Sequence, residues 1–255
     1  MPTTLATALL LAASAAATSP PVAPACSGHS PAHTIALLEL YTSEGCSSCP
    51  PADQFVRGLR AGGLTSQQVV PLSLHVDYWN DIGWKDPYSS ADFTERQRRL
   101  SALANSRTVY TPEIFVGGRE QRRWPDGALD AIRRSNATVA RAGIAIAMRP
   151  AEGGALAAEV TATGPAGALL QVALVQNGLV SAVKRGENAG RTLHHDFVAR
   201  QWFEGGRIGA AGTARQSSVI KPVAGADLAL TAFVQSDQGE ILQAYSLPLC
   251  APPQR

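Results

Sequence analysis

The sequence lacks a strong excess of charge of either sign. Its 22 lysines and arginines nearly balance 20 aspartates and glutamates, which gives a formal net charge of +2. The arginines are spread along the chain and form no basic stripe with interleaved aromatic residues. The sequence therefore indicates neither a nucleic-acid partner nor binding to an anionic membrane surface.

Long apolar runs are also missing. Residues 5–17 contain only Leu, Ala, Thr and Ser, but a helix that spans a bilayer needs about 20 apolar residues. We therefore expect no transmembrane segment. The run suits the apolar core of a secretory signal peptide, so we predict a signal peptide at residues 1–25 and a periplasmic or secreted protein. No Lys or Arg precedes the run, and a disordered Ala-rich tail is the alternative.

Cysteine is scarce, with four residues in the chain. Cys26 and Cys250 flank the expected folded region. Domain termini often lie close together, and disulfides persist outside the cytosol, so we predict a Cys26–Cys250 disulfide. Lipidation of Cys26 would leave Cys250 unpaired. It is disfavoured because Ala23 occupies the position where a lipoprotein signal carries Leu or a similar residue.

Apolar residues make up 45% of the chain, enough for a core in one or two domains. Up to residue 140, strand-like and helix-like segments alternate, which predicts a sheet with helices packed on it. The expected strands are 34–40, 69–76 and 109–116, and the expected helices are 52–60, 90–105 and 125–140.

After residue 141 the helical spacing disappears. Short apolar segments separated by Gly, Pro and Asn predict an all-β sandwich domain at residues 141–250. The expected strands of this domain are 143–148, 156–163, 169–176, 193–203, 228–235 and 241–247.

A C-x-x-C motif, Cys46-Ser47-Ser48-Cys49, follows the first expected strand at the beginning of the first expected helix. A helix N-terminus lowers the pKa of the first thiol, and the second thiol can attack a mixed disulfide that the first has formed. The motif predicts a Cys46–Cys49 disulfide. It fits a redox-active pair, a permanent structural disulfide or two metal ligands.

Five segments carry a further signal. They are residues 38–53 (LELYTSEGCSSCPPAD), 75–79 (HVDYW), 83–87 (GWKDP), 109–112 (VYTP) and 186–195 (GENAGRTLHH). Together they resemble the exported thioredoxin-like family called domain of unknown function 1223, over about residues 35–248. The resemblance implies an α/β thioredoxin-like domain at residues 33–140 followed by the all-β sandwich domain, but it implies no particular reaction.

Four residues are candidates for catalysis. Cys46 would attack or be attacked, and Cys49 would resolve the mixed disulfide. Thioredoxin-like folds place a cis-proline beside the cysteine pair, so the resemblance assigns Pro112 to orienting a bound peptide. Glu39 precedes Cys46 by seven residues, and its carboxylate could take the proton of Cys49. Alternatively, Glu39 faces solvent or pairs with an arginine.

Other candidates concern substrate and loop contacts. Thr111, which precedes the proline, could pair with a peptide through its backbone. Trp79 and Trp84 could cover the cysteine pair or pack between the domains. His75 and Asp77 share one face of a strand, where they could tune the thiolate, complete a metal site or hydrogen-bond the loop.

The polar segment 184–195 could meet the cysteine edge, or it could form a hairpin turn that satisfies its own polar groups. Its candidate residues are Glu187, Asn188, Arg191, His194 and His195.

Three functions remain open from the sequence. The first is an exported thiol–disulfide oxidoreductase without a cofactor, acting on protein thiols or disulfides. The second is a copper or zinc protein that uses Cys46, Cys49 and His75, or one of His194 and His195 in place of His75, although the chain has no Met-rich or His-rich tract. The third is a binding module with an inert disulfide.

Overall fold

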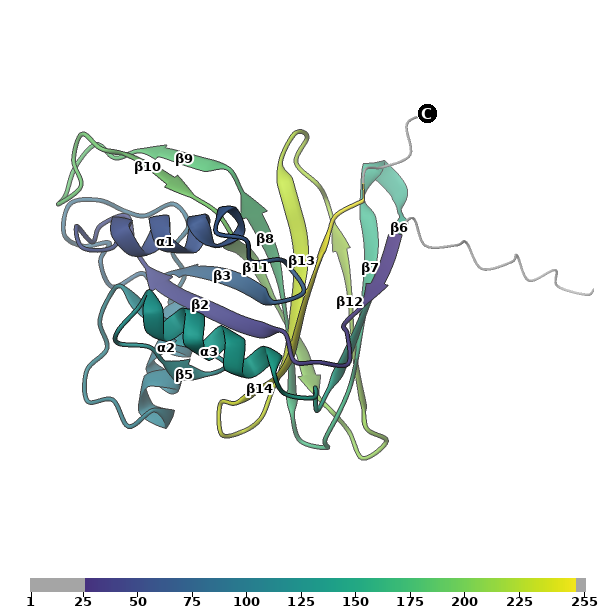
Figure 1. Cartoon of the computed structure of the whole chain (residues 1–255). Helices are drawn as coiled ribbons and strands as arrows, with labels where there is room; N and C mark the ends of the chain where they lie inside the picture. Colours follow the sequence, from purple (N-terminus) through teal and green to yellow (C-terminus); the bar gives the residue numbers. More distant parts are fainter. Residues whose placement is uncertain (1–25, 251–255) are drawn as a thin grey trace, which may run out of the picture.

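The computed structural model describes residues 26–250 (Figure 1), so the predicted signal peptide lies outside the described residues. The helices are α1 (Pro50–Ala61), α2 (Ala91–Leu103) and α3 (Asp126–Asn136), with a short 3-10 helix at Glu152–Gly154. The strands are β1 (Cys26–His29), β2 (Ala36–Thr42), β3 (Val69–His75), β4 (Glu113–Val116), β5 (Arg119–Glu120), β6 (Gly143–Pro150), β7 (Leu156–Thr163), β8 (Leu169–Asn177), β9 (Leu179–Ala182), β10 (Thr192–His195), β11 (Val198–Arg207), β12 (Thr213–Ile220), β13 (Asp227–Gln235) and β14 (Ile241–Pro248).

The largest sheet has eight strands in the order β14-β13-β8-β11-β3-β2-β4-β5. Strand β2 pairs in parallel with β3 and antiparallel with β4. The two halves of the sheet meet where β11 pairs with β3 through Val198 and Ser73. Ser73 strengthens this junction because its N–H donates to the Phe197 carbonyl at 2.8 Å and its hydroxyl to the Asp196 carbonyl at 3.0 Å.

A second sheet has four strands in the order β1-β6-β7-β12 and packs on the C-terminal half of the large sheet. Its strands have one buried and one exposed face. In β7, Leu156, Ala158, Val160 and Ala162 are buried while the residues between them are more exposed. Side chains alternate along a strand, so this pattern places one face of the sheet against the core.

The helices cover both faces of the N-terminal half of the large sheet. The Thr42 hydroxyl donates to Asp53 of α1, whereas Glu39 bonds Arg96 of α2. Residues three apart in a strand point to opposite faces, so α1 and α2 lie on opposite sides of β2. In the described part of the chain, no helix is long and apolar enough to cross a membrane.

The expected fold, an α/β thioredoxin-like domain followed by an all-β sandwich domain, is wrong. The chain is mostly β, and the large sheet continues across residue 141 because β11, β8, β13 and β14 extend the edge of β3. The N-terminal β1 also joins β6 in the second sheet. Local periodicity predicts strands but not which strands pair, since an open edge can be completed by any distant strand. The division of the chain at residue 141 into two folding units stays a prediction.

The Cys26–Cys250 disulfide joins the beginning and the end of the described chain. It links β1 to the residue that lies just beyond β14, with the two Cα atoms 5.9 Å apart. Because β1 belongs to the second sheet and β14 to the large one, the bond ties the two sheets together.

Candidate functional site

Cys46 and Cys49 form a disulfide at the beginning of α1, with their Cα atoms 5.5 Å apart. Cys49 is the N-cap residue, and Pro50 and Pro51 begin the helix. Proline suits these positions because its φ is already helical and no N–H donor is needed there. Both cysteines are completely buried, whereas Ser47 between them is exposed.

The loop between β9 and β10 covers the disulfide from outside, and Figure 1 shows this hairpin lying over α1. The Ser47 N–H donates to a Glu187 carboxylate oxygen at 3.0 Å. The Asn188 amide donates to the carbonyls of Glu44 and Cys46, both at 2.9 Å. Asn188 is fully buried, so its two bonds satisfy carbonyls that the covering loop removes from water.

The polar segment 184–195 therefore does meet the cysteine loop. Arg191 contributes indirectly, because its guanidinium donates to the side-chain amide oxygen of Asn188 at 2.9 Å. His194 is exposed on β10 and points away from this network, whereas its neighbour His195 is buried within it.

A buried group of acids and histidines lies beside the cysteine loop. His195 Nε2 lies 3.0 Å from a Glu44 carboxylate oxygen, and Trp84 donates its indole N–H to the other oxygen at 2.8 Å. His75 Nδ1 lies 2.7 Å from an Asp86 carboxylate oxygen, which also accepts the Glu44 N–H at 2.8 Å. The two imidazole rings are 4.9 Å apart, so both pairs form one cluster.

The contact between His75 and Asp86 favours the charged form of both groups. Burial alone would lower the pKa of His75, but the Asp86 carboxylate outweighs it and the pKa is raised. Burial would raise the pKa of Asp86, but His75 and two backbone N–H donors lower it. Opposite directions on the two partners indicate an imidazolium–carboxylate pair.

Asp53 adds a buried carboxyl group one helical turn after Cys49. It follows Cys49 by four residues in α1, so both side chains lie on the same face of the helix. Burial raises the pKa of Asp53, while His75 and His195 oppose this shift. Burial therefore favours the protonated form of a carboxyl group that lies one helical turn from Cys49.

The alternative metal site is not assembled in the described structure. Cys46 and Cys49 are joined to each other, and residues 26–250 contain no group of three His, Cys, Asp or Glu side chains with metal-site geometry. His75 Nε2 and His195 Nδ1 are buried without a hydrogen-bond partner among the described residues. Asp77 belongs to a separate contact, since it accepts the Thr94 hydroxyl at 2.5 Å.

Glu39 does not lie under the cysteine pair. Its side chain is on the α2 face of β2, where Arg96 donates to it at 2.6 Å and the Tyr41 hydroxyl at 3.2 Å. The sequence suggested a proton carrier in the strand before the motif. The structure instead places a carboxyl group near Cys49 from the helix after it, at Asp53.

The segment at Pro112 lies beside the cysteine loop. The Thr111–Pro112 peptide bond is cis, and the Ser48 hydroxyl lies 3.5 Å from the Thr111 carbonyl oxygen. Trp79 donates its indole N–H to the Thr111 hydroxyl at 2.8 Å and packs against Gly45. The structure thus brings Thr111, Pro112 and Trp79 to the loop, whereas Trp84 bonds the buried Glu44.

Glu113 is a buried carboxyl group that sequence reasoning missed. It accepts hydrogen bonds from the Gln97 amide at 2.7 Å and from the Ser101 hydroxyl at 3.2 Å. Burial raises its pKa to about 7. The only signal in the sequence is an acidic residue directly after Pro112 in an otherwise apolar strand.

A family model described as Protein of unknown function (DUF1223) matches residues 37–235. The chain belongs to this family. The match includes both cysteines of the motif and the covering loop, so the disulfide and its buried surroundings lie within the DUF1223 region.

Two solved structures are similar in fold to this DUF1223 chain. One is the crystal structure of protein AGR_C_4864 from Agrobacterium tumefaciens, with 24% identity, a TM-score of 0.59, and coverage of 88% of this chain and 97% of that one. The other is HBP35 of Porphyromonas gingivalis, with 15% identity, a TM-score of 0.65, and coverage of 89% and 79%. At these identities the likeness concerns the fold alone. No curated protein matches the sequence significantly.

Proposed function

We propose that the Cys46–Cys49 pair exchanges electrons with thiols or disulfides of other exported proteins. The observation that carries the proposal is a disulfide at a helix N-terminus with the buried carboxyl group of Asp53 one turn behind Cys49. The helix N-terminus stabilises a thiolate on Cys46. The carboxyl group supplies a place for the proton of the buried Cys49.

In the reducing direction, the Cys46 thiolate attacks a substrate disulfide. A bond forms between Cys46 and one substrate sulfur, and the other substrate sulfur leaves as a thiolate that takes a proton from water. The Cys49 thiol then passes its proton to Asp53 and attacks the Cys46 sulfur. This step forms the Cys46–Cys49 disulfide and releases the second substrate thiolate. The substrate gains the two electrons that the cysteine pair loses. The one proton lost by Cys49 passes from Asp53 to water, and the second substrate thiolate, like the first, takes a proton from water.

Surrounding residues have supporting roles in this proposal. A protonated His75 would favour the ionised form of Asp53, which is the form that accepts a proton. Thr111, Pro112 and Trp79 lie beside the exposed Ser48, so we assign them to partner contact. Glu39 has no role in the exchange because it pairs with Arg96 on the other face of β2.

Two disulfides are typical of proteins in oxidising compartments. They support the proposed signal peptide at residues 1–25 and a periplasmic or secreted location, where partner proteins also carry disulfides.

A structural disulfide is the second candidate, and one observation favours it. Both cysteines are completely buried under the loop of Glu187 and Asn188, so no partner reaches a sulfur atom unless this loop opens. In that case the chain would act as a binding module.

The reduction potential of the Cys46–Cys49 pair distinguishes a redox-active pair from a structural disulfide. We would equilibrate the C26S/C250S variant in glutathione and dithiothreitol buffers and quantify free thiols by labelling and mass spectrometry. We expect a potential between about −120 and −270 mV, the range of working oxidoreductases. A potential below about −300 mV would identify a structural disulfide and contradict the proposal.

Trapping of a mixed disulfide tests the roles of the two cysteines. We expect C49S to accumulate a mixed disulfide with a disulfide-bonded substrate protein, because Cys46 can still attack. The matched variant C46S keeps Cys49 but loses the thiolate that the helix N-terminus stabilises on Cys46, so it is expected to trap none. Equal trapping by both variants would contradict the assignment of Cys46 as the attacking residue.

A further inference from the structure

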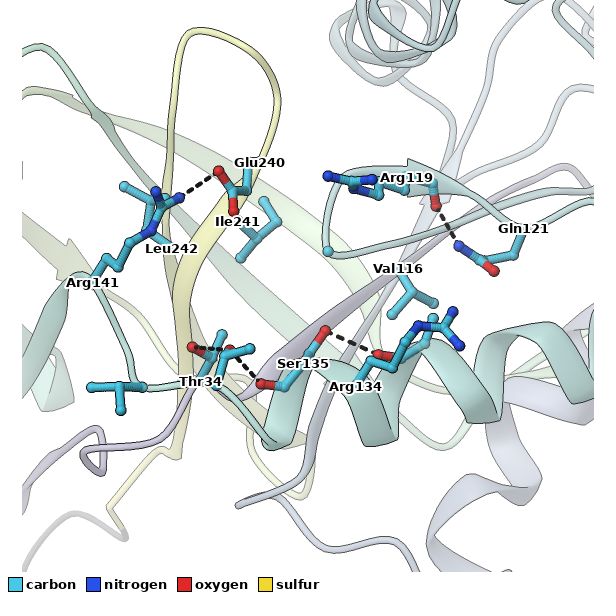
Figure 2. Close-up of a pocket in the computed structure, with 14 residues that line it drawn as sticks. Thr34, Val116, Arg119, Gln121, Arg134, Ser135, Arg141, Glu240, Ile241 and Leu242 are labelled. Atoms are coloured by element: carbon cyan, nitrogen blue, oxygen red, sulfur yellow. Dashed lines mark hydrogen bonds and ion pairs between the residues drawn. The ribbon is translucent and has the colours of Figure 1, made fainter.

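A cavity of about 570 Å³ lies at the opposite end of β2 from the disulfide. Its walls come from α3, from the turn that follows β4 and from the beginning of β14 (Figure 2). Thr34, just before β2, lines the cavity, whereas Cys46 follows the far end of the strand. The seven residues of β2 separate the two sites by roughly 20 Å. The cavity is therefore independent of the disulfide.

Two tightly packed turns lie beside the cavity and hold its wall in place. Gly118 and Gly239 lie in two neighbouring turns, and a Cβ atom on Gly118 would approach the Gly239 carbonyl oxygen to 1.8 Å. Gly118 also has a φ of 81°, which favours glycine. The Ile241 N–H donates to the Gly117 carbonyl at 3.3 Å and fixes β14 against the same turn. The size falls within the range of small-molecule sites, about 300–1,000 Å³.

The floor is apolar. Val116, Ala131, Ile241 and Leu242 line the cavity and are each less than a tenth exposed. These side chains come from β4, α3 and β14, so three elements present apolar surface to the same space. A ligand that fills the cavity would bury an apolar body against them.

Hydroxyl groups of the wall already have partners. The Thr138 hydroxyl donates to the Ser135 carbonyl at 2.7 Å and lies 3.1 Å from the Thr34 hydroxyl. The Ser135 hydroxyl donates to the Ala131 carbonyl at 3.0 Å. Recognition of a ligand is therefore left mainly to the charged groups.

The charged groups give the cavity an excess of positive charge. Arg141 pairs with Glu240, as Figure 2 shows. Arg119 and Arg134 also line the cavity, and neither has an acidic partner within residues 26–250. A guanidinium group presents its donors in a fork that matches a carboxylate.

We propose that this cavity binds a small amphiphilic carboxylate, with its carboxylate on Arg119 or Arg134 and its hydrocarbon body on the floor. The apolar floor argues against a bare anion such as phosphate, which would leave that surface unused. The guanidinium groups argue against an uncharged apolar ligand, which would leave the positive charge unpaired.

Octanoate is a suitable probe, and titration calorimetry on the oxidised protein measures its binding. We expect a Kd of about 0.1–1 mM, given the size of the ligand. Higher salt should weaken binding because the guanidinium groups are exposed. Octan-1-ol keeps the hydrocarbon body without the carboxylate, and inorganic phosphate keeps the negative charge without the hydrocarbon body. Both should bind much more weakly than octanoate.

The double variant R119Q/R134Q should bind octanoate about tenfold more weakly or worse, since it loses charge-assisted hydrogen bonds. R215Q is the matched control, because Arg215 is exposed on β12 and does not line the cavity. Circular dichroism checks that both variants are folded. Methyl NMR shifts of Ile241 and Leu242 locate the ligand.

Three results would overturn the proposal. The first is that the Ile241 and Leu242 methyl signals do not shift at millimolar octanoate. The second is that octanol or phosphate binds as tightly as octanoate. The third is that R119Q/R134Q and R215Q bind octanoate with equal affinity.

Discussion

Glu113 shows how one buried carboxyl group makes stability depend on pH. Its pKa of about 7, against an ordinary value of 4.5, means that between these pH values the folded protein holds a proton which the unfolded chain has lost. The contribution of Glu113 to stability therefore falls as pH rises from 4.5 to about 7 and does not return above that range. The shift corresponds to about 3 kcal/mol of unfolding free energy.

The E113Q variant tests this reasoning, because glutamine keeps the shape and cannot ionise. We expect the stability difference between E113Q and wild type to move in favour of E113Q by up to about 3 kcal/mol between pH 4.5 and pH 8. Urea unfolding at each pH measures the free energy of unfolding of E113Q and of wild type. Subtracting one from the other removes the contribution of the other ionisable groups. A difference that does not change with pH would show that Glu113 ionises normally.

At the residue scale, the sequence predicts the cysteine motif but only part of its surroundings. Cys46 and Cys49 are recognisable because their spacing is local. Glu39 and Asp53 are both acids near the motif, and which of them points to it depends on the face of the strand or helix that carries it. Asp53 could have been found from its i, i+4 spacing to Cys49. Asp86 could not, because it reaches the loop from 40 residues away.

At the element scale, local periodicity predicts the long apolar elements and misses short or polar ones, such as β9 (LVSA) and β12. The expected strand 69–76 is observed as β3, and the expected helix 90–105 as α2. Strand β12 was missed because its sequence, TARQSSVI, is largely exposed at the edge of the second sheet. The expected strand 193–203 is two strands, because Phe197 has a φ of 58° and interrupts the extended chain.

The β9–β10 hairpin acts on the disulfide through Asn188, and the variant N188A tests this contact. Two buried carbonyls would lose their donor, at a cost of about 1–3 kcal/mol. The covering loop would then open more often. We expect dithiothreitol to reduce the Cys46–Cys49 bond about tenfold faster or more in N188A, as measured by quenched thiol labelling.

The variant H194A is the control for this experiment. His194 lies in the same hairpin but is exposed and makes no side-chain hydrogen bond within the described chain. Its reduction rate should equal that of wild type. If N188A is reduced no faster than H194A, the loop does not limit access to the disulfide.

At the scale of the whole molecule, buried polar contacts join the two halves of the chain. Gln243 of β14 accepts the Ile35 N–H at 2.8 Å and donates to the carbonyls of Pro31 and His33, both at 3.0 Å. On the α2 side, Arg96 donates to Gln235 of β13 at 3.1 Å. Each half therefore completes hydrogen bonds that the other half leaves open.

This shared interior predicts that the two halves unfold together. A fragment of residues 26–140 would lose Gln243 and Gln235, and each buried group left without a partner costs about 1–3 kcal/mol. It would also expose the edge of β3 and the apolar surface beneath β14. These losses are large compared with the total stability of a typical domain, which is only about 5–15 kcal/mol.

We expect the oxidised mature protein to unfold in one transition that fluorescence and circular dichroism report at the same denaturant concentration. We expect the fragment to lack dispersed amide NMR signals. Two separate transitions together with a folded fragment would instead establish the division of the chain at residue 141.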